Sequence, residues 1–153
     1  MAQQIDLRLT QDSQSTFDIG FADTGDFDMV EGFDTSLQMS IFAERRASSS
    51  EVPDAIRRRG WIGNALSEIP DFEIGSKIWL FEQARLTNDT INGVQDAALK
   101  ATAWLVEDGL AIDIQASIAG STSEGTIDLK MTIFADSSRV EERFFTLWLN
   151  TGT

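Results

Sequence analysis

The sequence predicts an α+β fold in which an antiparallel sheet packs against two or three helices. The last third of the chain alternates apolar and polar residues in segments joined by short turns, which is typical of antiparallel strands with one buried face. The middle third instead carries apolar residues at helical spacing. No internal repeat or low-complexity linker divides the 153 residues. We therefore expect a single domain, residues 1–153, with residues 1–33 as an acidic strand and hairpin segment.

The N-terminal region is predicted to form short strands. Apolar and polar residues alternate in 5–9 and 17–21, and a shorter candidate covers 27–32. Residues 22–26 are Ala-Asp-Thr-Gly-Asp, which suit a tight turn. Four nearby carboxylates do not have the spacing of a twelve-residue calcium loop, so a solvated hairpin is the favoured interpretation. These carboxylates belong to Asp23, Asp26, Asp28 and Glu31.

A first helix is expected at about 34–47. Asp34 or Thr35 is suited to cap it, and Leu37 and Ile41 lie one turn apart on its apolar face. The run Glu44-Arg45-Arg46 would then occupy the last turn, where arginines complement the helix dipole. Pro53 in the following polar segment prevents the helix from continuing.

Two more helical segments are expected after residue 74. Residues 75–85 contain four consecutive apolar residues that fit a strand or a helix, and Ser76 as a possible cap favours the helix. Residues 88–108 keep their apolar positions on one face, and Gly109 is placed to end that helix.

Three strands forming a meander are predicted at 112–118, 126–134 and 144–149, because apolar residues occupy alternate positions in each. The expected core combines one face of this sheet with the helix before it. It comprises Ile91, Val94, Ala98, Leu105, Ile114, Leu129, Ile133 and Trp148, and Trp104 is also expected to be buried.

Composition limits the possible chemistry. The chain contains no cysteine and no histidine, so it lacks thiolate ligands, disulfides and the commonest general base. Its apolar runs are far shorter than the ~20 residues of a membrane helix. The first twelve residues have neither a basic start nor an apolar block, so no secretion signal is expected. The net charge of −13 opposes general binding to nucleic acid or anionic membranes, and no cofactor or metal is expected.

Positive charge is concentrated between residues 45 and 59. This segment carries five arginines, Arg45, Arg46, Arg57, Arg58 and Arg59, against two acids, whereas residues 1–44 carry nine acids and one arginine. Trp61 follows the last three arginines directly, and arginine and tryptophan dominate the energetics of many protein interfaces. An anion site, a nucleic-acid contact, a joint between subunits and a merely solvated turn are all compatible with this pattern.

Glu44 is the candidate residue for an enzymatic alternative. A carboxylate pair can hydrolyse a sugar chain, and Glu44 would be the acid of a peptidoglycan-degrading muramidase. The competing interpretation is that Glu44 forms an ion pair with one of the nearby arginines. No phosphate loop, nucleophile elbow or zinc-ligand spacing is present.

Five segments in a fixed order carry a resemblance to a known family. They are SIFAERRA (40–47), VPD (52–54), RRGWIGN (58–64), IGSKIWLFEQAR (74–85) and ALKATAWLVEDGLA (98–111). In this order they resemble the Mu-type phage baseplate protein family, which is similar in turn to the baseplate wedge proteins of contractile-tailed phages. The resemblance covers about residues 34–118. Family members usually have Asp where Glu44 stands and a second aromatic residue where Ile62 stands.

The resemblance implies a structural role without catalysis, as a wedge subunit that links the tail tube and sheath to the other wedge proteins. The implied partners are those wedge proteins, the central hub and tube, and proteins next to the sheath, with several copies around a six-fold axis. The implied location is the tail baseplate of a virion assembled in a bacterial cytoplasm. An alternative is a small acidic module that binds a basic partner through residues 1–34. In the wedge interpretation, the interface residues are Glu44, Arg45, Arg46, Arg57, Arg58, Arg59 and Trp61.

Overall fold

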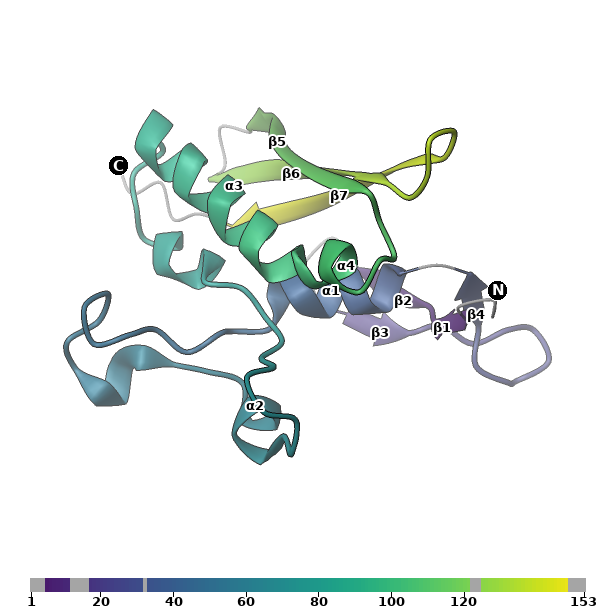
Figure 1. Cartoon of the computed structure of the whole chain (residues 1–153), viewed down its shortest axis with the longest axis horizontal. Helices are drawn as coiled ribbons and strands as arrows, with labels where there is room; N and C mark the ends of the chain where they lie inside the picture. The colour runs from purple at the N-terminus through teal and green to yellow at the C-terminus, as the bar shows by residue number, and fades with distance from the viewer. Residues whose placement is uncertain (1–4, 12–16, 32, 122–124, 149–153) are drawn as a thin grey trace. The chain divides into compact units, whose positions relative to one another are not determined.

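The computed structural model describes residues 5–11, 17–31, 33–121 and 125–148. It confirms the α+β class, with short antiparallel strand pairs near the N-terminus and a three-stranded antiparallel sheet near the C-terminus (Figure 1). The chain forms two compact units, Met1–Met39 and Ser40–Thr153. No helix in the described ranges is both long enough and apolar enough to cross a membrane.

The first unit is built on one extended segment that pairs with two others. Its first part, β1 (Ile5–Leu7), pairs with β4 (Met29–Glu31), and its second part, β2 (Leu9–Gln11), pairs with β3 (Phe17–Ile19). Arg8 lies between the two pairs, where its N–H donates to Asp28 and its carbonyl accepts from Gly20, both at 2.8 Å. Its side chain also forms an ion pair with Asp28 at 2.6 Å. The predicted strands are thus confirmed with shifted ends.

The expected turn at residues 22–26 is also confirmed. Ala22 N–H donates to the Asp26 carbonyl at 2.9 Å, and Gly25 adopts a φ of +85°, which glycine tolerates readily. The rings of Phe21 and Phe27 stack at 5.5 Å on either side of the turn, and both are exposed.

The first helix, α1 (Asp34–Phe42), is shorter than expected. Leu37 and Ile41 are buried as its spacing predicts. The expectation that it continues to residue 47 is wrong, because Ser76 Oγ bonds the Ile41 carbonyl at 2.6 Å and the following residues pair with Ser76 instead. The helix-like 75–85 segment is confirmed only as one 3-10 turn, η2 (Ile78–Phe81).

The helix expected at residues 88–108 is confirmed, with one interruption. It consists of α3 (Asn88–Thr102) and α4 (Trp104–Glu107), and Thr87 Oγ1 caps α3 by accepting from Thr90 N–H at 3.2 Å. Gly109 ends it as expected, at a φ of +71°. The N–H groups of Gly109 and Leu110 bond the carbonyls of Val106 and Leu105, which is the Schellman arrangement.

The C-terminal sheet is a meander of β5 (Asp113–Ser121), β6 (Thr126–Phe134) and β7 (Val140–Trp148) in that order. The strand β6 has the bounds expected from its alternation. The strand β7 begins four residues earlier than expected, because Asp136 organises a tight turn by accepting the N–H groups of Ser138 and Arg139 at 2.8 Å. These bonds, led by the one from Ser138, lower the pKa of Asp136.

The core lies on one face of this sheet, and α3 runs against β5 (Figure 1). Of the expected core residues, Val94, Ala98, Leu105, Leu129 and Ile133 are buried. Ile91 and Ile114 are only partly buried, which corrects the prediction, and the side chain of Trp148 lies outside the described part. Trp104 is also only partly buried, which corrects the prediction, and its Nε1 donates to the buried Ser40 Oγ at 3.0 Å.

Candidate functional site

The candidate site begins where α1 ends. Residues 43–47 are extended and pair in parallel with Ser76, whose N–H donates to Ala43 and whose carbonyl accepts from Arg45, both at 2.8 Å. Gly75 makes this approach possible. It has a φ of +108°, and a Cβ there would lie 2.5 Å from the Ala43 carbonyl oxygen. Glu44, Arg45 and Arg46 are therefore on an extended segment and not in the last turn of a helix.

Backbone hydrogen bonds also join residues 43–47 to the chain around the three arginines. Trp61 N–H donates to the Glu44 carbonyl at 2.7 Å, and Ala47 N–H donates to the Arg58 carbonyl at 3.1 Å. The 3-10 turn η1 (Ala55–Arg58) ends at Arg58, and α2 (Ile62–Leu66) follows Trp61. We call residues 54–73 the arm; its path is visible in teal below the helices in Figure 1.

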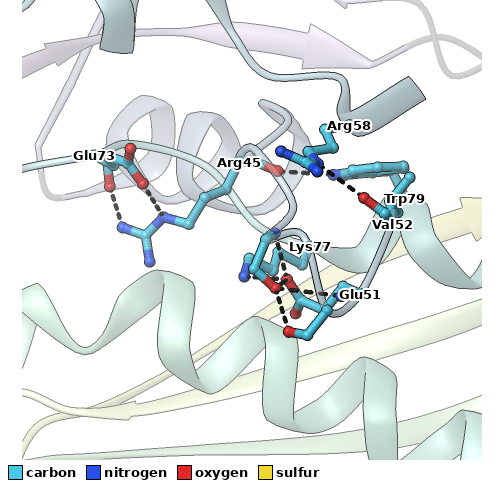
Figure 2. A network of polar contacts seen from close by, with 9 residues as sticks. Arg45, Glu51, Val52, Arg58, Glu73, Lys77 and Trp79 are labelled. Carbon is cyan, nitrogen blue, oxygen red and sulfur yellow. Dashed lines mark hydrogen bonds and ion pairs between the residues drawn. The ribbon is translucent and has the colours of Figure 1, made fainter. Parts of the chain in front are cut away.

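Arg46 and Arg58 hold the base of the arm through backbone carbonyls. The Arg46 guanidinium donates to Arg59 at 3.0 Å and to Ala55 at 3.1 Å. Arg58 donates to Val52 at 2.8 Å (Figure 2) and to Pro53 at 2.9 Å. Among the described residues, neither arginine forms an ion pair that the structure records.

Arg59 is the arginine that pairs with Glu44. Its Nη1 lies 2.9 Å from Glu44 Oε1 and 2.9 Å from Glu82 Oε2, and its guanidinium lies 5.0 Å from the centre of the Trp79 ring. The hydrogen bond that Arg59 donates to Glu82, followed by the one it donates to Glu44, raises the pKa of Arg59. The ion pair anticipated for Glu44 is confirmed. All three charged side chains are about 40% exposed (42, 39 and 43%), so each pair contributes only ~0–1 kcal/mol.

Figure 2 shows two further ion pairs, which Arg45 and Lys77 form with Glu73 and Glu51. Arg45 pairs with Glu73 at 3.5 Å and also donates to the Glu73 carbonyl, while the Arg45 carbonyl accepts from Trp79 Nε1 at 2.9 Å. Lys77 Nζ lies 2.7 Å from Glu51 Oε2. The bonds from Lys77, and then from Ser48, lower the pKa of Glu51 from 4.5 to about 2.

Arg57 is placed differently from the other four arginines. Its side chain is exposed and forms no hydrogen bond or ion pair recorded for the described residues. It lines a cleft of about 460 Å³ together with Trp79, Leu80 and Val52. Trp61 is 39% exposed, and its ring lies over Gly63, where a Cβ would approach it to 2.3 Å.

Most of the charged side chains at this site are bonded to one another or to backbone carbonyls. The Glu44 carboxylate is bonded to Arg59, and no group of three acidic side chains in the described ranges is arranged to hold a metal ion. The sequence-based site omitted six residues that the fold brings to it. Four of the six lie in the segment from Gly75 to Arg85, for which the sequence predicts a helix, and that segment is the signal that could have found them. The omitted residues are Glu51, Glu73, Ser76, Lys77, Trp79 and Glu82.

Comparison with known proteins adds a second line of evidence. Residues 33–140 match the model of a family described as "Phage protein GP46". The chain is 36% identical over 86 residues to the "Baseplate protein gp46" of Escherichia phage Mu, covering 54% of this chain and 57% of that protein. It is 30% identical over 110 residues to the "Mu-like prophage FluMu protein gp46" of Haemophilus influenzae, covering 72% of this chain and 73% of that protein. The match to the phage Mu protein therefore spans little more than half the length of either chain.

Proposed function

The chain belongs to the phage protein GP46 family, and from this premise we propose that it is a structural subunit of a phage baseplate. The observation that carries the proposal is the extent of the family match, which includes α1, the arm, η2, both later helices and most of the C-terminal sheet. The relative from phage Mu is named a baseplate protein, and this name supports the proposed role. The location proposed for the chain is accordingly the tail of a virion.

More specifically, we propose that it is a wedge subunit of a contractile tail that links the tube and sheath to the other wedge proteins. Its partners are then those wedge proteins, the central hub and tube, and proteins next to the sheath, with copies repeated around a six-fold axis. Assembly takes place in the host cytoplasm. The role is non-enzymatic and uses no cofactor. The ion pair between Glu44 and Arg59 supports the non-enzymatic role. The exposed apolar side chains of the arm support a role in contacts with other subunits.

The interface is proposed to involve the arm and its base. Arg45, Arg46, Arg58 and Arg59, together with Glu44, give the arm its shape through the bonds described above. Arg57 and Trp61 keep exposed side chains that a neighbouring subunit can reach. The seven residues therefore divide into a group that builds the interface and a pair that is available for direct contact.

Electron cryo-microscopy of purified tail particles tests the structural role. We expect density that accommodates this fold in the baseplate, repeated by the symmetry of the tail. Particles complete in their other tail proteins but without such density would overturn the proposal. A purified chain that digests peptidoglycan, and loses that activity in Glu44→Gln, would contradict the non-enzymatic role.

A further inference from the structure

The arm exposes large apolar side chains in unusual number. Ile56 is 94% exposed, Leu66 74%, Ile62 69% and Ile69 63%, and neither η1 nor α2 contains a buried residue. Single exposed apolar residues are common on soluble proteins, but a concentration of them in one segment marks an interaction surface.

The exposure does not result from a lack of internal bonding. Beyond the arginine bonds at its base, Asn64 uses both ends of its amide to bond the backbone of Ile74, donating at 2.7 Å and accepting at 2.8 Å. Trp61 is fixed through its N–H by the Glu44 carbonyl and lies against Gly63. The arm is thus held in shape by polar bonds while its apolar side chains point to solvent. Such preorganisation reduces the entropic cost of binding a partner.

The charge on the arm indicates what kind of surface it fits. Ile56, the most exposed of these side chains, is followed directly by Arg57, which has no ion-pair partner recorded among the described residues. An apolar contact next to an unpaired guanidinium matches a partner surface with an apolar groove and a carboxylate at its rim. A second copy of this chain is disfavoured as the partner, since two molecules of charge −13 repel each other.

We propose that the arm docks into an apolar groove on a different baseplate protein, where a carboxylate at the rim receives Arg57. This inference rests on the proposed baseplate function and specifies how the chain joins its neighbour. Ile56, Ile62, Leu66 and Ile69 are the apolar anchors.

Photocrosslinking in assembled tail particles tests which molecule occupies the arm. A benzoylphenylalanine at Leu66 is compared with one at Ile112, a 64% exposed isoleucine next to the sheet and outside the arm. We expect the Leu66 probe to label another tail protein, on a peptide that contains apolar residues and an Asp or Glu. Labelling of a second copy, of lipid or of nucleic acid, or labelling no stronger than that from Ile112, would overturn the proposal.

Substitutions test whether the contact matters for assembly. The double variant Ile56→Ser/Ile69→Ser is compared with Ile112→Ser, and Arg57→Glu with Arg57→Lys. The readout is the number of copies per tail particle by quantitative mass spectrometry, with thermal unfolding of each purified chain as the check on folding. We expect at least a roughly tenfold loss of incorporation for the double variant and for Arg57→Glu, a smaller loss for Arg57→Lys, and no loss for Ile112→Ser.

Two outcomes separate this inference from the function on which it rests. If the wild-type chain is absent from the baseplate, the proposed function fails. If the wild-type chain is present and the folded arm variants enter particles at the wild-type level, only the docking inference fails. A wild-type dimer in analytical ultracentrifugation that the arm variants abolish would assign the arm to a second copy and would also overturn it.

Discussion

The C-terminal sheet and the arm belong to the same compact unit but differ in what they bury. Every second residue of β6 from Ile127 to Ile133 is at most 1% exposed, whereas the arm buries no residue in either of its helical turns. The sheet is stabilised by apolar packing, and the arm is shaped by hydrogen bonds from arginine and asparagine to backbone groups. The difference indicates that the sheet maintains the fold, and it supports the proposal that the arm contacts a partner.

The largest difference in stability is expected between an alanine substitution of a leucine in the sheet and one of a leucine in the arm. Leu129 is fully buried, so Leu129→Ala should lower the free energy of unfolding by ~2–5 kcal/mol. Leu66→Ala should change it by less than ~0.5 kcal/mol, because that side chain is already exposed. Denaturant unfolding followed by circular dichroism measures both. Similar losses for the two variants would remove the distinction between the regions.

Gly75 tests the junction from which the arm departs. Gly75→Ala should cost ~1–3 kcal/mol, since it combines a positive φ with a clash against the Ala43 carbonyl. Gly109→Ala is the matched variant, because its φ is also positive but no atom lies within 4 Å of the new Cβ. Its loss should be smaller. Chemical denaturation of both variants gives the comparison, and an equal loss would show that the close approach of the two segments is unimportant.

Adjacent arginines test the division of roles at the arm. Arg58→Ala should lower the free energy of unfolding by ~1–2 kcal/mol, because it removes the bonds to the Val52 and Pro53 carbonyls. Arg57→Ala should leave stability unchanged and weaken only assembly. Thermal and chemical unfolding of the two purified variants provides the measurement. If Arg57→Ala destabilises the monomer as much as Arg58→Ala does, Arg57 belongs to the internal fold.

The smallest effect concerns the pH dependence of Glu51. Its pKa is lowered to about 2 in the folded chain, so the ionised carboxylate stabilises the fold above about pH 4.5, and this contribution is lost as the pH falls toward about 2. The side chain is 36% exposed, which limits the contribution to less than ~1 kcal/mol. The stability difference between wild type and Glu51→Gln should therefore shrink as the pH falls from about 4.5 toward about 2.

A direct titration checks the pKa on which this prediction rests. An NMR titration of the Glu51 carboxyl group should have its midpoint near about 2. A midpoint near 4.5 would show that the Lys77 and Ser48 bonds do not persist in solution.

Much of the fold and part of the site were predictable from local patterns. The alternation in residues 126–134 predicted the bounds of β6, and Gly109 predicted where the helix formed by α3 and α4 ends. The arginines around residue 58 form several side-chain bonds to backbone carbonyls, and their role at an interface stays a prediction. The predictions for the sheet and the helix succeed because strand alternation, helix periodicity and glycine at positive φ are properties of a short stretch of chain.

The sequence by itself determined the α+β class, the meander, the α3 face and the absence of thiol and imidazole chemistry. Only the tertiary structure decided where α1 ends, because the residue that bonds its last turn, Ser76, lies 35 positions from Ile41. It also decided which arginines of the cluster are internally bonded, since their partners come from separate segments of the chain; for Arg57 no such partner is recorded among the described residues. Local pattern specifies secondary structure, whereas long-range pairing determines which side chains remain exposed for a partner.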